Sequence, residues 1–130
     1  MLWSKTLETG IPKIDEQHQE LFRQADFLLD RSKADKVEAT LKFLKDYVAK
    51  HFFDEEAFHR ASQYPKAEPH KQLHVEFSGG LKKQLEEYFK ATNKSASILT
   101  INSMVTGWLR DHIMRHDKEF ATYYIQKQQR

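Results

Sequence analysis

The stretch VEATLKFLKDYVAKHFFDEEAF, residues 37–58, carries the regular pattern that decides the expected fold. Its apolar residues recur alternately every three and four positions, and His51 and Glu55 continue the same series. The full series is Val37, Leu41, Leu44, Val48, His51, Glu55 and Phe58. Alternating steps of three and four are typical of the stripe that a helix turns toward the core of a helical bundle. The sequence therefore predicts a helix with polar residues on its core-facing stripe.

The same spacing recurs in three further blocks, separated by short stretches of polar, glycine or proline residues. These blocks are Ile14, His18, Leu21, Ala25, Leu28; then His70, His74, Phe77, Leu81, Leu85, Tyr88; and finally Ile98, Ile101, Val105, Trp108, His112, followed by His116. Short connections make consecutive helices antiparallel neighbours. The sequence thus predicts an all-α fold, an up-down-up-down antiparallel four-helix bundle formed by a single domain, residues 1–130.

Three features stand outside this regular pattern. Gly10 and Pro12 mark an irregular N-terminal arm. The tail KEFATYYIQKQQR, residues 118–130, has aromatic residues at helical spacing, which predicts a short C-terminal helix packed on the outside of the bundle. Gly79 and Gly80 interrupt the third block, where each costs about 1 kcal/mol against alanine. They indicate either a close helix contact or a local kink.

The composition excludes several classes of protein and of site. With 21 basic and 19 acidic side chains, the chain has a net charge of +2, which argues against nucleic acid or an anionic membrane as partner. There is no cysteine, which excludes disulfides and thiolate metal sites. No apolar run approaches the roughly 20 residues of a membrane span, and the start MLWSKTLETG lacks the apolar core of a secretion signal. We therefore expect a soluble cytoplasmic protein.

The histidines occupy positions where a core should be apolar. Six of the seven lie on the stripes, and only His59 does not. A single core histidine usually bonds a carbonyl, but six together with Glu55 are harder to accommodate, because an uncompensated buried carboxylate costs several kcal/mol. These histidines lie at the starts of the first and third blocks and near the ends of the second and fourth. In an up-down-up-down bundle, these four locations are at the same end. The sequence predicts a buried metal site there.

The donor types narrow the choice of metal. Imidazole with a few carboxylates suits iron, zinc, copper or nickel, whereas the lack of sulfur argues against iron–sulfur clusters. About seven candidate ligands exceed the needs of one ion, so two metals bridged by carboxylates fit the count better. A b-type haem held by two histidines is the structural alternative. It would leave at least three of these histidines and Glu55 without a role.

The stretch DHIMRHD, residues 111–117, contains two candidates for a metal ligand in addition to His112, namely His116 and Asp117. On a regular helix His116 lies about 40° round the axis from His112, and Asp117 lies about 140° away. Regular geometry therefore favours His116. A carboxylate, in contrast, would help to neutralise two metal ions in a core of low dielectric constant. The residues alone leave both candidates open.

Four segments together resemble the hemerythrins, specifically the bacterial single-domain bacteriohemerythrins. They are GIPKIDEQHQEL around His18, HFFDEE from His51, HKQLH from His70 to His74, and WLRDHIMRHD leading to Asp117. Each short segment is a weak signal, but the ordered set is very specific and spans essentially the whole chain. The resemblance implies a four-helix bundle with a non-haem di-iron centre that binds O2 reversibly.

The resemblance also implies a role for each polar residue. Carried over by position, the ligands are His70, His74 and His112 for one iron, His18 and His51 for the other, and the bridging Glu55 and Asp117. An oxo or hydroxo group completes the bridge between the two irons (Fe2+/Fe3+), and the second iron keeps an open position for O2. Asp117 can then reach the site only if the helix loosens after His112, by a wide π-type turn or by ending. On this assignment His116 is a neighbouring or surface residue, and His59 is a surface residue.

Apolar residues near the ligands suit a dry O2 pocket. Water and anions promote loss of bound oxygen in a reduced form, so reversible binding needs their exclusion. The candidates are Phe22, Phe52, Trp108, Leu109 and Ile113, and the resemblance places Trp108 and Leu109 near the O2 side. Ordinary core packing explains Phe22 and Phe52 equally well.

These expectations combine into a function. We predict an O2 carrier, store or supplier that is not an enzyme, a monomer in preference to an oligomer, serving an O2-consuming enzyme as a possible partner. One alternative is an O2 or redox sensor acting through a partner, because the chain has no length for an output domain of its own. The other is a di-iron enzyme that handles peroxide, nitric oxide or ferrous iron.

Overall fold

The computed structural model describes residues 3–129, which form helices without any strand. The five α-helices are α1 (Pro12–Phe27), α2 (Val37–Ala61), α3 (Ala67–Lys90), α4 (Lys94–His112) and α5 (Lys118–Gln128). Two 3-10 segments, η1 (Lys5–Leu7) and η2 (Arg31–Lys36), precede α1 and α2, and a π-helical segment, η3 (Ile113–Asp117), joins α4 to α5. The prediction of an all-α fold is confirmed.

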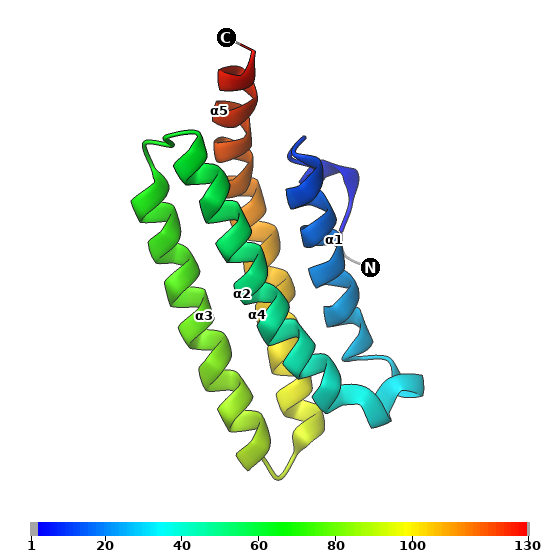
Figure 1. The fold of residues 1–130 in the computed structure, drawn as a ribbon. Helices are drawn as coiled ribbons and strands as arrows, with labels where there is room; N and C mark the ends of the chain where they lie inside the picture. Colours follow the sequence, from blue (N-terminus) through cyan, green and yellow to red (C-terminus); the bar gives the residue numbers. More distant parts are fainter. Residues whose placement is uncertain (1–2, 130) are drawn as a thin grey trace.

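Helices α1 to α4 run alternately up and down, side by side (Figure 1). Helix α1 packs against α2 and α4, and α3 packs against the other sides of the same two helices. Each helix therefore contacts its neighbour in sequence, and the last helix returns to the first. This is the predicted up-down-up-down bundle.

The predicted stripes form the interior of this bundle. Every stripe residue is buried or half-buried, and most of the apolar ones belong to a long core cluster that includes Leu21, Leu44, Leu81 and Ile101. A second, smaller cluster contains Ile11, Ile14, Tyr64, Phe120 and Ala121. Fully burying a leucine or isoleucine side chain contributes about 1.5–3 kcal/mol, so these two clusters supply most of the stability of the fold.

The N-terminal arm is fixed to the first turn of α1 by one carboxylate. Asp15 accepts hydrogen bonds from the backbone N–H and hydroxyl of Thr9, at 2.8 and 2.7 Å, and from the N–H of Gly10 at 3.1 Å. Gly10 has a φ angle of +91°, a backbone conformation that residues with a side chain rarely adopt. Pro12 then starts the helix, where its missing N–H is not needed. The arm thereby sets the direction in which α1 enters the bundle.

The predicted short C-terminal helix is present, but it does not pack on the outside of the bundle. Helix α5 continues from α4 through η3 and extends beyond the end of the bundle (Figure 1). No glycine or proline interrupts residues 112–118, so nothing in that stretch turns the chain back. Phe120 anchors the start of α5 in the smaller core cluster, and the Tyr123 hydroxyl donates to the Ser62 carbonyl at 2.6 Å.

Neither Gly79 nor Gly80 marks a close helix contact, because no atom lies within 4 Å of the position that a Cβ would occupy at either residue. Helix α3 also runs unbroken through both positions. We therefore expect Gly79→Ala and Gly80→Ala each to raise the free energy of unfolding by about 1 kcal/mol, through the loss of backbone entropy in the unfolded chain. Urea denaturation measures this change.

Gly10→Ala is the matched control, since its Cβ would lie 3.0 Å from the Ile125 side chain on a backbone with positive φ. This variant should lower the free energy of unfolding. A loss of stability in the two α3 variants would show that the glycines have a packing role.

No helix within residues 3–129 is long and apolar enough to cross a membrane.

Candidate metal centre

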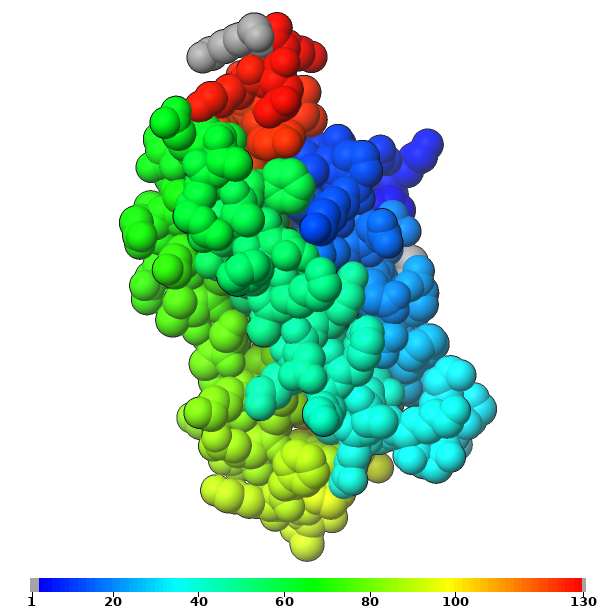
Figure 2. Space-filling model, in the orientation of Figure 1, coloured from blue at the N-terminus to red at the C-terminus, as the bar shows by residue number. Residues whose placement is uncertain are grey.

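The structure brings all seven predicted ligand residues into one buried layer of the bundle. They come from every long helix: His18 from α1, His51 and Glu55 from α2, His70 and His74 from α3, His112 from α4, and Asp117 from η3. None is more than 3% exposed. Side chains of α2 pack against those of α1 and of α3 over the face shown in Figure 2.

The seven residues form two overlapping groups of donor atoms. One consists of Glu55, His70, His74, His112 and Asp117, and the other of His18, His51, Glu55 and Asp117. Within each group the donor atoms lie within 4.8 Å of one another. The two carboxylates belong to both groups, which is the arrangement that two ions with shared carboxylates require.

In the first group three imidazoles surround one oxygen of each carboxylate. The Nε2 atom of His70 lies 2.9 Å from Oε1 of Glu55 and 3.1 Å from Oδ1 of Asp117. The same Oε1 lies 3.2 Å from Nε2 of His74, and the same Oδ1 lies 3.1 Å from Nε2 of His112. Three nitrogens and two oxygens thus converge on one point.

In the second group two imidazoles face the other oxygens of the same carboxylates. The Nε2 atom of His18 lies 3.0 Å from Oδ2 of Asp117, and Nε2 of His51 lies 3.8 Å from Oε2 of Glu55. Each carboxylate therefore directs one oxygen to each group. The second group has one imidazole fewer than the first.

These separations fit metal coordination. Imidazole and carboxylate donors bind first-row divalent ions at about 2.1 Å, which places neighbouring donors of one ion about 3 Å apart. All four carboxylate oxygens and both ring nitrogens of His18 are buried without a hydrogen bond from residues 3–129. Burying such groups without a partner is costly. A pair of cations is the partner that this donor set lacks.

The pKa shifts of Glu55 and His70 indicate that this part of the site favours positive charge, whereas that of His51 follows its burial. Burial and the charge of Asp117 oppose ionisation of Glu55, but the imidazoles of His70 and His74 hold its pKa at about 2. Against burial, the neighbouring carboxylates of Asp117 and Glu55 raise the pKa of His70 to about 9. Burial, together with His18, lowers the pKa of His51 to about 3, so this imidazole is neutral at pH 7.

The wide turn of η3 explains how Asp117 reaches the centre. Ile113–Asp117 is π-helical, and the N–H of Lys118 bonds the carbonyl of Ile113, five residues earlier. The predicted loosening of the helix after His112 is therefore confirmed. Asp117 is 1% exposed inside both donor groups. His116 is half-buried, stays outside both groups, and has its ring centroid 5.2 Å from that of His112.

Two hydrogen-bond partners of the candidate ligands are absent from the sequence prediction. The Nδ1 atom of His51 lies 2.7 Å from Oε1 of Gln17, and Nδ1 of His74 lies 2.8 Å from Oε2 of Glu56. Both partners are sequence neighbours of candidate ligands, His18 and Glu55. That adjacency is the only signal in the sequence, and it does not indicate which imidazole each partner contacts.

The prediction that His59 lies on the surface is wrong. Its side chain is 1% exposed, with its ring centroid 4.5 Å from that of His70 and 4.3 Å from that of Phe120. Tyr64 and the start of α5 cover this face of α2, which widens the buried stripe at this end of the bundle. Burial lowers the pKa of His59 to about 4, so it is neutral at pH 7.

Replacing His59 by leucine should raise the free energy of unfolding by about 1 kcal/mol. Both ring nitrogens of His59 lack a hydrogen-bond partner among residues 3–129, and an unsatisfied buried polar group costs about 1–3 kcal/mol. The matched variant His59→Asn keeps a polar group, loses volume and should destabilise. Urea denaturation measures the free energy of unfolding of both variants. A large decrease in His59→Leu would show that the polar ring of His59 stabilises the fold.

Apolar and aromatic side chains line one side of the candidate centre. Phe52 stacks on His74 with ring centroids 3.9 Å apart, and Trp108 stacks on His112 at 4.3 Å. A cavity of about 10 Å³ lies beside them, lined by Leu21, Val48, Phe52, Phe77, Val105, Trp108 and Leu109. Ile113 and Phe22 are fully buried but do not line this cavity.

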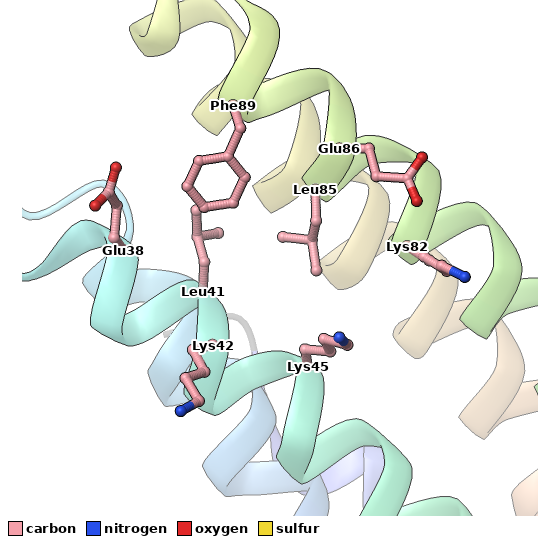
Figure 3. Close-up of a pocket in the computed structure, with 8 residues that line it drawn as sticks. All are labelled: Glu38, Leu41, Lys42, Lys45, Lys82, Leu85, Glu86 and Phe89. Atoms are coloured by element: carbon pink, nitrogen blue, oxygen red, sulfur yellow. The ribbon is translucent and has the colours of Figure 1, made fainter.

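A far larger cavity, of about 480 Å³, lies between α2 and α3 at the other end of the bundle (Figure 3). Leu41, Leu85 and Phe89 form its apolar floor, and lysine and glutamate side chains surround them. It contains none of the candidate metal ligands.

Comparisons with known proteins point to one family. The family model described as Hemerythrin HHE cation binding domain matches residues 9–124. The chain is 30% identical to the bacteriohemerythrin of Clostridium acetobutylicum, over 92% of this chain and 97% of the relative. It is also 30% identical to the myohemerythrin of Theromyzon tessulatum, over 91% and 88%, and 28% identical to a bacteriohemerythrin of Campylobacter jejuni, over 88% and 87%.

Proposed function

Because the chain belongs to the hemerythrin family, we propose that it binds O2 reversibly at two non-haem iron ions. The observation that carries this proposal is the division of each carboxylate, with one oxygen of Glu55 and of Asp117 directed to each group of imidazoles. When bound, the two ferrous ions would lend O2 one electron each and recover both when it leaves.

The unequal numbers of imidazoles would leave room for O2 on one side of the centre. The three imidazoles of the first group and one oxygen of each carboxylate would hold one ion. His18 and His51, with the other oxygen of each carboxylate, would hold the second ion with one imidazole fewer. We therefore expect O2 to bind on the side of His18 and His51.

The residues also favour release of O2 over its activation. As ligands, five imidazoles carry no charge, so together with two carboxylates they supply less negative charge than the carboxylate-rich sites of other di-iron bundles. High-valent iron is correspondingly less stabilised. The apolar side chains of Phe52, Trp108 and Leu109 line the neighbouring cavity and would keep water from it. We propose that the protein carries, stores or supplies O2, with an O2-consuming enzyme as its recipient.

A cycle of reduction, aeration and degassing tests this function. The purified protein should contain two irons per chain, be colourless when reduced without air, gain a visible absorption band with one O2 per chain, and lose the band on degassing. The same cycle repeated several times measures reversibility. Oxidation that does not reverse, or sustained O2 consumption with a reductant present, would contradict a carrier and favour a redox sensor or an enzyme.

A further inference from the structure

We propose that Gln17, oriented by Asp54, is a positioning residue that keeps His51 the weaker electron donor, while Glu56 makes His74 the stronger one. The inference rests on the proposed function, because it concerns the two sides of the same centre. On this proposal, the imidazole ligands on the side of His18 and His51 donate less electron density to their metal ion than those on the side of the three imidazoles.

The orientation of the Gln17 amide follows from its two partners. Its Nε2 lies 2.7 Å from Oδ2 of Asp54, and a carboxylate can only accept a hydrogen bond. The amide oxygen must therefore face Nδ1 of His51, at 2.7 Å. Since that oxygen is also only an acceptor, Nδ1 of His51 carries the proton. The Nε2 lone pair of His51 is then free to bind metal, on the side of Glu55.

The partner of His74 differs in charge. Oε2 of Glu56 accepts a hydrogen bond from Nδ1 of His74 at 2.8 Å. A hydrogen bond to a carboxylate is about twice as strong as one to a neutral amide, and it makes the imidazole a more basic ligand. His74 therefore receives more electron density from its partner than His51 does.

On the Nδ1 side of His51, Gln17 separates the imidazole from the carboxylate of Asp54, whose charge is compensated. Asp54 contacts Gln17 rather than the imidazole, and Nζ of Lys50 and of Lys13 lie 2.8 and 3.8 Å from its Oδ2. Gln17 itself is 4% exposed, so water does not replace it as a partner. The weaker donor, His51, should keep the ion that it binds ferrous more readily, which favours return of O2 unchanged.

The double variant Gln17→Glu with Asp54→Asn tests this inference. It conserves net charge and the hydrogen-bond chain, but moves the carboxylate into contact with His51. Gln17→Glu alone would place two carboxylates together. We expect the double variant to favour the oxidised centre about tenfold, which lowers the midpoint potential by about 59 mV for one electron. Autoxidation, in which O2 takes two electrons and two protons and leaves as hydrogen peroxide, should be about tenfold faster.

Glu56→Gln is the mirror variant and should raise the midpoint potential. Iron content and unfolding temperature should stay near the wild-type values in the double variant, because its hydrogen bonds are kept. A purely structural role for Gln17 predicts an unchanged potential, and that result would overturn the inference. A wild type that binds no O2 would overturn the proposed function and this inference together.

A second readout does not depend on iron. In the metal-free protein, 15N NMR of the histidine rings should show His51 protonated at Nδ1 in the wild type. Gln17→Ala should shift this tautomer toward the Nε2 form, whereas Gln17→Glu with Asp54→Asn should retain the Nδ1 form. A His51 tautomer that is the same in all three proteins would overturn the assignment of Gln17.

Discussion

Replacing Asp117 by alanine should reduce the iron content from two ions per chain to one or none. Asp117 offers Oδ1 to the group of three imidazoles and Oδ2 to the group of two, so its removal takes a donor from both ions. It also removes half of the negative charge that compensates the cations in the core. An iron assay on the purified variant, with unfolding followed in parallel, measures the effect.

His116→Ala is the matched control on the same segment. Its ring is half-buried and lies outside both donor groups, so this variant should keep two irons and its O2 band. The two variants separate the carboxylate from the imidazole that regular helix geometry would select. Loss of iron from His116→Ala together with full loading of Asp117→Ala would reverse the ligand assignment.

Replacing Leu109 by alanine should leave two irons in place but hasten autoxidation by about tenfold or more. Leu109 is 3% exposed and lines the cavity of about 10 Å³ beside the centre, at the limit of what one water molecule needs. Truncation enlarges this cavity, and water that enters promotes loss of oxygen in reduced form. The decay of the visible O2 band in air-saturated buffer gives the rate.

Leu81→Ala provides the control for destabilisation alone. Leu81 is 2% exposed in the same core cluster, seven residues beyond His74 and therefore about 10 Å along α3. Each leucine variant should lose about 2–5 kcal/mol of stability. Only Leu109→Ala should shorten the lifetime of the O2 form. Equal lifetimes in the two variants would remove Leu109 from the pocket.

The stripes of the four helices could be predicted because burial repeats with the helical period. His51 and Glu55 continue the apolar series that begins at Val37, so their place in the interior follows from spacing alone. The convergence of the histidines at one end follows in turn from the antiparallel order. That the seven residues are metal ligands is still a prediction, which their shared geometry supports.

Spacing could not select Asp117, because a regular helix turns His116 toward the centre instead. The choice came from the family resemblance, and the π-helical turn of η3 supplies the physical reason. Inserting a wide turn rotates every later residue, so a periodicity fixed upstream fails from that point onward. The same continuity of the helix explains why α5 extends from α4 rather than packing as a separate element.

The burial of His59 and the hydrogen-bond partners of the ligands could not be predicted from the period of one helix, because both depend on contacts between helices. His59 lies off the α2 stripe, but Tyr64 and Phe120 cover it from other segments. Glutamine and glutamate are common on exposed helix surfaces, so Gln17 and Glu56 give no signal in the sequence. Packing of α1 against α2 brings Gln17 to His51, and packing of α3 against α2 brings His74 to Glu56.

Anomalous diffraction at the iron absorption edge, from crystals of the aerobically purified protein, tests the central claim most directly. Two peaks are expected within the bundle, both beside Glu55 and Asp117, one contacted by His70, His74 and His112 and the other by His18 and His51. The second iron should have a coordination position that no protein atom occupies. A single peak, or a peak contacted by His116 in place of Asp117, would contradict the two-iron site derived from this sequence.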